Sequence, residues 1–198
     1  MISDRAGSPT GKSDTGFALV EVLVAVLVSA IGVLGLAAMQ ISAKRAIYEA
    51  AQRSIATNLA GDMLERMRSN PSALAAYRVM GLEGPATPST RNCSMSVCSA
   101  LQLAAHDLFE WSALLQGASE SVEINGRATD VGGLAAASAC ITHTAGLVSV
   151  ALSWRGVHVM ANPTESSCGN SDASYGPSSG LRRLLVMTSY IGVQRVQP

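Results

Sequence analysis

One carboxylate lies inside an otherwise apolar stretch near the amino terminus. Glu21 falls in the 23-residue run Phe17 to Met39, which contains no other charged residue. An ionisable group at membrane depth costs roughly 2.5–3.5 kcal/mol even on insertion scales, so it needs a partner or a purpose. A nearby cation would stabilise the carboxylate. Glu21 is therefore the first candidate functional residue.

The four cysteines form the second group of reactive side chains: Cys93, Cys98, Cys140 and Cys168. All of them follow the apolar run. An even number on one side of a membrane segment indicates disulfides in an oxidising compartment, which in a bacterium is the periplasm. Four cysteines allow three connectivities. We favour Cys93–Cys98, a small local ring, and Cys140–Cys168, which closes a loop of about 28 residues.

Other chemistry is not expected. The cysteines do not form paired C-x2-C knuckles and the histidines lack ligand spacing, so no metal site is predicted. His106 and Asp107 are adjacent but have no nucleophile signature to join them, and we expect an exposed pair on a helix rather than an enzyme. Residues 6–13 fall one glycine short of a phosphate-binding loop and lack its preceding strand, so no cofactor is predicted. Net charge is zero without a basic run, which argues against nucleic acid as a partner.

The apolar run itself is long enough to cross a hydrocarbon core of about 30 Å as a helix. A secretory signal peptide would be cut after Gly35 to Ala37, but its apolar region spans only about 7–15 residues. The alternative is cleavage between Gly16 and Phe17, which leaves the helix on the mature protein. Residues 1–16 would then be a leader.

Helical character continues after the run. Residues 40–68 are amphipathic, and their apolar row repeats every four residues: Ile47, Ala51, Ile55, Leu59, Met63 and Met67, widened by Ala60 and Leu64. Ser69-Asn70-Pro71 ends the pattern. We therefore predict one spine helix over 17–68, with 17–39 transmembrane, and a globular head over 69–198.

The head is predicted to be a small α+β domain. Residues 71–90 are typical of a loop, and Ser99 with Gln102 indicates the start of a helix that reaches Gln116. Its apolar row is Leu101, Ala104, Leu108, Trp111 and Leu115, with Trp111 expected in the core. Five later segments show strand character: 121–125, 139–144, 147–154, 157–161 and 184–191. Turn candidates at Asn125-Gly126 and Ala145-Gly146 favour an antiparallel sheet of about four strands laid over the spine, with a long serine-rich loop at 163–180.

The segment from Gly16 to Ala25, GFALVEVLVA, resembles the prepilin signature of type IV pilins, usually written G-F-T-L-I-E. Ala18 and Val20 depart from it conservatively. The resemblance implies a type IV pilin-like fold, cleavage after Gly16 by a prepilin peptidase, and N-methylation of Phe17. It also associates Glu21 with methylation and subunit recruitment, and places the leader on the cytoplasmic side.

The order of features in the head resembles the minor pilins called type IV pilus modification protein PilV. These features are the cysteine pair, the helix with Trp111, Cys140 before the strand ending in Trp154, and Cys168 with Arg182-Arg183 before the last strand. This resemblance implies a minor pilin with a single inner-membrane span and a periplasmic head. Its partners would be other minor and major pilins and the inner-membrane assembly platform. The alternatives are a minor pseudopilin of type II secretion and a membrane-anchored periplasmic binding domain or enzyme.

Overall fold

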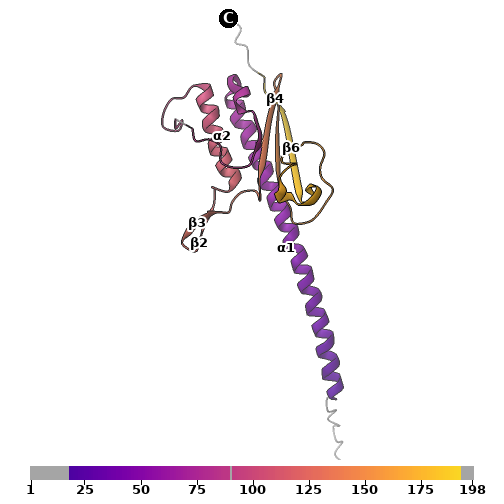
Figure 1. Ribbon diagram of the computed structural model, residues 1–198. Helices are drawn as coiled ribbons and strands as arrows, with labels where there is room; N and C mark the ends of the chain where they lie inside the picture. Colours follow the sequence, from indigo (N-terminus) through magenta and orange to yellow (C-terminus); the bar gives the residue numbers. More distant parts are fainter. Residues whose placement is uncertain (1–17, 90, 193–198) are drawn as a thin grey trace, which may run out of the picture. The chain divides into compact units, whose positions relative to one another are not determined.

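The structure is a computed structural model that describes residues 18–89 and 91–192 (Figure 1). The chain divides into two units, Met1–Lys44 and Arg45–Pro198. Helix α1 (Leu19–Ser69) contributes to both, and all other elements belong to the second unit. The expected α+β architecture, a long N-terminal helix with a small antiparallel sheet, is confirmed.

Helix α1 runs for 51 residues without a proline. It ends at Ser69 because Pro71 disfavours helical backbone at the preceding residue, and Asn70 has φ −130° and ψ 57°. A 3-10 helix, η1 (Pro71–Tyr77), follows directly, and the short strand β1 (Val79–Leu82) follows η1. The prediction of a loop throughout 71–90 is therefore wrong.

The buried stripe of α1 differs from the predicted row at its beginning. Leu59, Ala60, Met63, Leu64 and Met67 are buried as expected, whereas Ile47 and Ala51 are exposed. Each step of four residues turns a helix by about 400°, so a strict i+4 row drifts off the buried face. The true stripe continues instead through Ala56 and Gln52.

Gln52 can be buried because both the nitrogen and the oxygen of its side-chain amide are hydrogen-bonded. Its Nε2 donates to Gly133 O at 3.3 Å, and its Oε1 accepts from Ala135 N–H at 3.0 Å. The stripe thus includes a polar residue that fixes a distant loop to α1, which hydrophobic periodicity does not reveal.

Helix α2 (Ala100–Gln116) begins and ends where its sequence predicts. Ser99 and Gln102 form a reciprocal capping box, and Gly117 ends the helix with φ 108°. Trp111 is fully buried and its Nε1 donates to Leu59 O at 2.9 Å. Leu101, at the start of the predicted apolar row, is 67% exposed instead.

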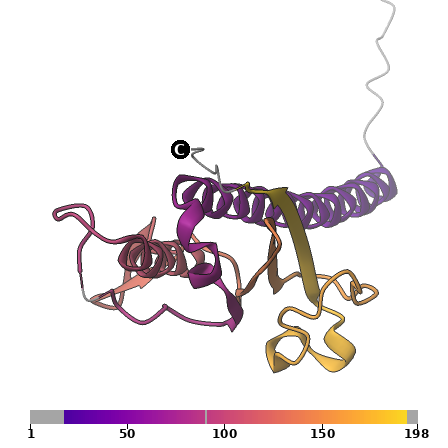
Figure 2. The same ribbon diagram turned by 90° about the horizontal axis from the view of Figure 1, so that it is seen from above.

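The main sheet has four antiparallel strands in the order β1-β4-β5-β6, where β4 is Ser138–Thr144, β5 is Leu147–Arg155 and β6 is Arg182–Tyr190. Together with α2 it packs against the C-terminal half of α1 (Figures 1 and 2). The turn between β4 and β5 uses Ala145 and Gly146 at positive φ, as predicted.

Residues 157–161 do not form the predicted strand. Gly156 N–H donates to Leu181 O at 2.7 Å, and Met160 N–H donates to Gly180 O at 2.8 Å. Between them, Val157 N–H donates to the Glu49 carboxylate at 2.8 Å. The segment is thus held by these separate hydrogen bonds to residues 180–181 and to α1 rather than by a regular strand ladder.

A second sheet is the hairpin β2 (Ser121–Ile124) and β3 (Arg127–Asp130), joined at Asn125-Gly126. All residues of both strands are exposed. The chain enters and leaves the hairpin through a close passage, where a Cβ on Gly133 would lie 2.5 Å from both Gly117 N and Leu115 O. Glycine is therefore required at position 133.

Candidate assembly surface

The sequence places the processing site at Gly16 and Phe17, and both residues lie outside those that the structure describes. Helix α1 begins two residues later, with Glu21 in its first turn. The Glu21 N–H donates to Ala18 O at 2.9 Å, and the side chain is exposed. A carboxylate in the first turn is stabilised by the unsatisfied N–H groups of a helix terminus.

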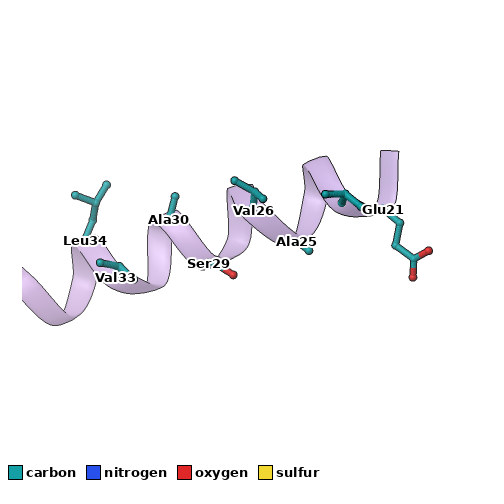
Figure 3. A pocket seen from close by; sticks show the side chains of 8 residues that line it. Glu21, Ala25, Val26, Ser29, Ala30, Val33 and Leu34 are labelled. Carbon is teal, nitrogen blue, oxygen red and sulfur yellow. The ribbon is translucent and has the colours of Figure 1, made fainter. Parts of the chain in front are cut away.

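Glu21 stands at one end of a shallow apolar depression on α1 (Figure 3). The depression is lined by Glu21, Val22, Ala25, Val26, Ser29, Ala30, Val33 and Leu34. Small residues at Ala25, Ser29 and Ala30 lower the helix surface between the larger valines. Stripes of small residues allow a second helix to approach closely in a membrane. The depression is therefore suited to another helix.

The rest of this part of α1 is equally uncovered. Every residue from 18 to 48 is exposed, among them Leu34 at 70% and Met39 at 71%. By length and composition, this helix could cross a membrane. Apolar surface of this extent marks an interaction with protein or membrane, which fits an anchor whose surface is covered by lipid or by other helices.

Two comparisons with known families assign these features. Residues 11–37 match the prokaryotic N-terminal methylation motif, and residues 38–109 match the family described as Type IV pilin Tt1218. The two matches adjoin and together cover half of the 198 residues. The chain matches a type IV pilin with a prepilin signature. No curated protein and no solved structure was found to match it.

The type IV pilin family is structural rather than enzymatic. The match to the methylation motif includes the helix turn that carries Glu21. The apolar part of α1 and the methylation motif fit the expected inner-membrane anchor. The part of the head beyond residue 109 is reached by neither match. Its features rest on the structure alone.

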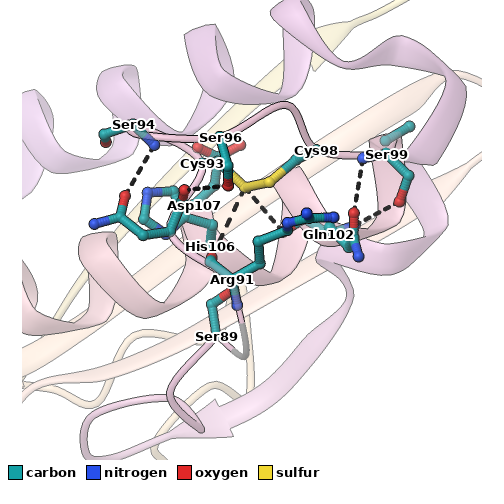
Figure 4. Close-up of a disulfide and its surroundings, with 12 residues drawn as sticks. Ser89, Arg91, Cys93, Ser94, Ser96, Cys98, Ser99, Gln102, His106 and Asp107 are labelled. Carbon is teal, nitrogen blue, oxygen red and sulfur yellow. Dashed lines mark hydrogen bonds between the residues drawn. A yellow bond between two sulfur atoms is a disulfide. The ribbon is translucent and has the colours of Figure 1, made fainter.

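Two disulfides cross-link the head. Cys93–Cys98 closes a small ring just before α2 (Figure 4), and Cys140–Cys168 joins β4 to the serine-rich loop. The second bridge is buried, with Cys168 only 3% exposed, whereas the ring lies at the surface.

Arg182 has a structural role that the sequence does not reveal. Its side chain is buried with 1% exposure and donates to the carbonyl oxygens of Cys168, Pro163 and Ser166 and to Asn162 Oδ1. Burial lowers the pKa of Arg182 below its usual value, but a guanidinium remains charged at neutral pH. The arginine thus replaces hydrogen bonds that a loop without regular structure cannot make to itself.

His106 and Asp107 are not the exposed pair that the sequence predicts. Both are buried, and Asp107 accepts from Tyr77 OH at 2.5 Å and from Arg66 Nη1 at 3.2 Å. Burial and the hydrogen bond to Asp107 raise the pKa of Tyr77. His106 Nε2 lies 3.2 Å from Glu110 Oε1 without hydrogen-bond geometry. The cluster joins α1, η1 and α2, so its role in the structure is to hold these elements together.

Proposed function

We propose that this chain is a minor pilin, of the kind called type IV pilus modification protein PilV. It is made with a leader of residues 1–16, cut by a prepilin peptidase between Gly16 and Phe17, and N-methylated at Phe17. The apolar helix over 17–39 then anchors it in the bacterial inner membrane with the head in the periplasm. The observation that carries the proposal is the methylation motif placed on a helix whose residues 18–48 are all exposed.

In this function the protein acts by assembly. Burial of the apolar helix among neighbouring helices supplies affinity without direction, because apolar contacts are non-directional. Glu21 supplies direction, since a carboxylate in an apolar environment is stabilised only near a cation. The methylated amino group of Phe17, from the same chain or a neighbouring one, is the cation available in this region. The carboxylate therefore sets the register in which the subunit enters a pilus or its initiation complex.

The amino terminus of the mature protein tests the proposal. We expect protein recovered from membranes or sheared pili to begin with N-methylated Phe17, as read by intact mass and N-terminal sequencing. A start at Ala38 would mean an ordinary exported protein, and an intact Met1 in a host with the peptidase would mean a plain anchor. Recovery in sheared pili, rather than only with a secretion apparatus, separates the pilus from a type II secretion pseudopilus.

A further inference from the structure

Exposed apolar side chains are concentrated in the loop that follows β5, residues 157–160, called here the apolar loop. Val157 is 43% exposed, Val159 is 80% exposed and Met160 is 59% exposed. No other four consecutive residues in the described part of the head expose as many large apolar side chains. Apolar groups exposed close together mark contact with a partner or with a membrane.

The apolar loop is held in place by α1 and by the residues before β6. Glu49 Oε1 accepts from Val157 N–H at 2.8 Å and from Arg183 Nη2 at 3.0 Å. Met160 N–H donates to Gly180 O at 2.8 Å. Because Gly180 precedes the first residue of β6 by two positions, the loop extends past this end of the sheet. Its side chains are thus presented on an ordered support, which reduces the entropy lost when they bind.

The side chains of α1 just before Glu49 are of the kinds found at the surface of a membrane. After Glu21, the first charged residues are Lys44 and Arg45, and Tyr48 follows with 41% exposure. Lysine and arginine near the end of a span reach toward the headgroups, and tyrosine is enriched where a membrane meets water. The next residue is Glu49, which binds the apolar loop.

Only a short length of helix separates these interfacial residues from the loop. Arg45 and Glu49 are four residues apart, which is about 6 Å along α1 and close to one turn. The headgroup layer on each side of a bilayer is itself about 5–7 Å thick. Transmembrane helices are also tilted by about 20° on average, which brings one side of a head closer to the lipid. A membrane crossed by α1 is therefore a partner within reach of the apolar loop.

We propose that the apolar loop inserts into the headgroup layer of the phospholipid membrane that α1 spans. Val159 and Met160 then bury apolar surface at the boundary between headgroups and acyl chains, the depth at which amphipathic segments bind. The contact restricts rotation of α1 about its own axis, because Glu49 and Arg183 fix the loop to the helix. The inference rests on the proposed function in that α1 is held in a membrane, and it adds a second membrane contact made by the head before the subunit enters a fibre.

Quenching by brominated lipid tests the contact with the full chain in vesicles of phosphatidylcholine. Val159→Trp introduces an indole into the apolar loop. The native Trp111 and Trp154 are buried, so their fluorescence is a constant background. Bromine on the acyl chains near the headgroups should quench the introduced indole, and its emission should shift to shorter wavelength relative to the same chain in urea.

Val97→Trp is the matched control. Val97 is 92% exposed and precedes α2, whose Ala100 O accepts from Asn70 at the other end of the head-bound part of α1. An indole at this position should keep the emission of an indole in water and should not be quenched.

A carboxylate in the loop adds a second readout. Met160→Asp in the Val159→Trp chain should lower the ratio of quenched to unquenched indole by about tenfold, which corresponds to 1.4 kcal/mol, because the new charge must leave water to enter the lipid. Met95→Asp in the same chain is the control, since Met95 is 85% exposed near Val97 and outside the apolar loop. It should leave the quenching unchanged.

Quenching of neither indole, or equal quenching of both, would overturn the proposal. Equal quenching would mean that the head lies on the bilayer without using the loop. The protein is purified from a host that has the prepilin peptidase, and its amino terminus is read by mass in the same samples. An N-methylated Phe17 start with an unquenched loop contradicts only the membrane contact, whereas a chain that keeps Met1 contradicts the proposed function whatever the quenching.

Discussion

Arg182 shows how a single side chain can replace secondary structure. The loop that it organises carries the buried end of the second disulfide, and three backbone carbonyls of that loop accept hydrogen bonds from the guanidinium. Removing the donor leaves these acceptors without partners in a buried place, and buried acceptors cost free energy when unsatisfied. The structure of this loop, which has no strand ladder, therefore depends on one residue.

We expect Arg182→Ala to lower the free energy of unfolding by about 2–4 kcal/mol. Arg182→Lys should recover only part of this loss, because an ammonium lacks the planar fork that reaches several acceptors at once. Urea denaturation of the full chain in detergent measures both. Arg155→Ala, an exposed arginine at the end of β5, is the control and should change little. Equal losses at both positions would contradict the role of Arg182.

Tyr175 predicts an alkaline limit to stability. Its hydroxyl donates to Ala136 O at 2.8 Å, and burial raises its pKa to about 12. The unfolded chain loses this proton near pH 10, so the folded state binds more protons above that pH and stability falls as pH rises. The loss should begin near pH 10 and continue to about pH 12, at up to about 1.4 kcal/mol per pH unit.

Tyr175→Phe isolates this effect. The variant should lose some stability at pH 7, since Ala136 O loses its donor, but should show a shallower decline between pH 10 and pH 12. Tyr190→Phe is the control, because Tyr190 is 71% exposed. Parallel pH profiles of Tyr175→Phe and the parent chain would show that this phenol does not contribute.

At the scale of elements, the two disulfides should differ in how much they stabilise the folded chain. Under the chain-entropy model, stabilisation grows with the length of the closed loop, which is 28 residues for Cys140–Cys168 and 5 for Cys93–Cys98. Replacing both cysteines of the longer loop by alanine should cost about 1.5 kcal/mol more than replacing both of the ring. Thermal unfolding of the two double variants measures this difference. A larger loss from the ring would mean that its contacts with α2 outweigh loop closure.

The elements that the sequence predicts well are those defined by local chemistry. The capping box of Ser99 and Gln102 and the glycine at 117 determine both ends of α2, and the two turns with positive φ determine their hairpins. These signals act within a few residues and need no knowledge of the fold.

The predictions from sequence fail where residues far apart in the chain determine the local structure. The strand expected at 157–161 is absent, and the Val157 N–H of this segment is bonded to Glu49 of α1 instead. The strand β1 escapes prediction because it is only four residues long with Gly81 at φ 74°. His106 and Asp107 have the composition of a surface pair, but both are buried, and Asp107 is hydrogen-bonded by Arg66 and Tyr77 from other elements. Burial of a polar residue depends on partners that periodicity cannot locate.

At the scale of the whole molecule, we expect Glu21 to contribute to assembly and not to the stability of the fold. Its carboxylate makes no hydrogen bond or salt bridge with the described residues, and its neighbours along α1 are exposed. Glu21→Ala should therefore leave the stability of the head unchanged, because no contact of the head is removed. Membrane insertion should also persist, since removing a charge makes an apolar span cheaper to insert.

The expected loss is in the pilus. If the carboxylate pairs with the amino group of Phe17 on the same or a neighbouring chain, Glu21→Ala should reduce the amount of this chain in sheared pili by about tenfold or more, the factor that corresponds to 1.4 kcal/mol. Immunoblots of membrane and pilus fractions measure it. Ser29→Ala lies in the same depression and changes a polar side chain without removing a charge, so it should enter pili normally. Normal entry of both variants would mean that apolar packing alone recruits the subunit, whereas equal loss of both would assign recruitment to the shape of the depression rather than to the charge of Glu21.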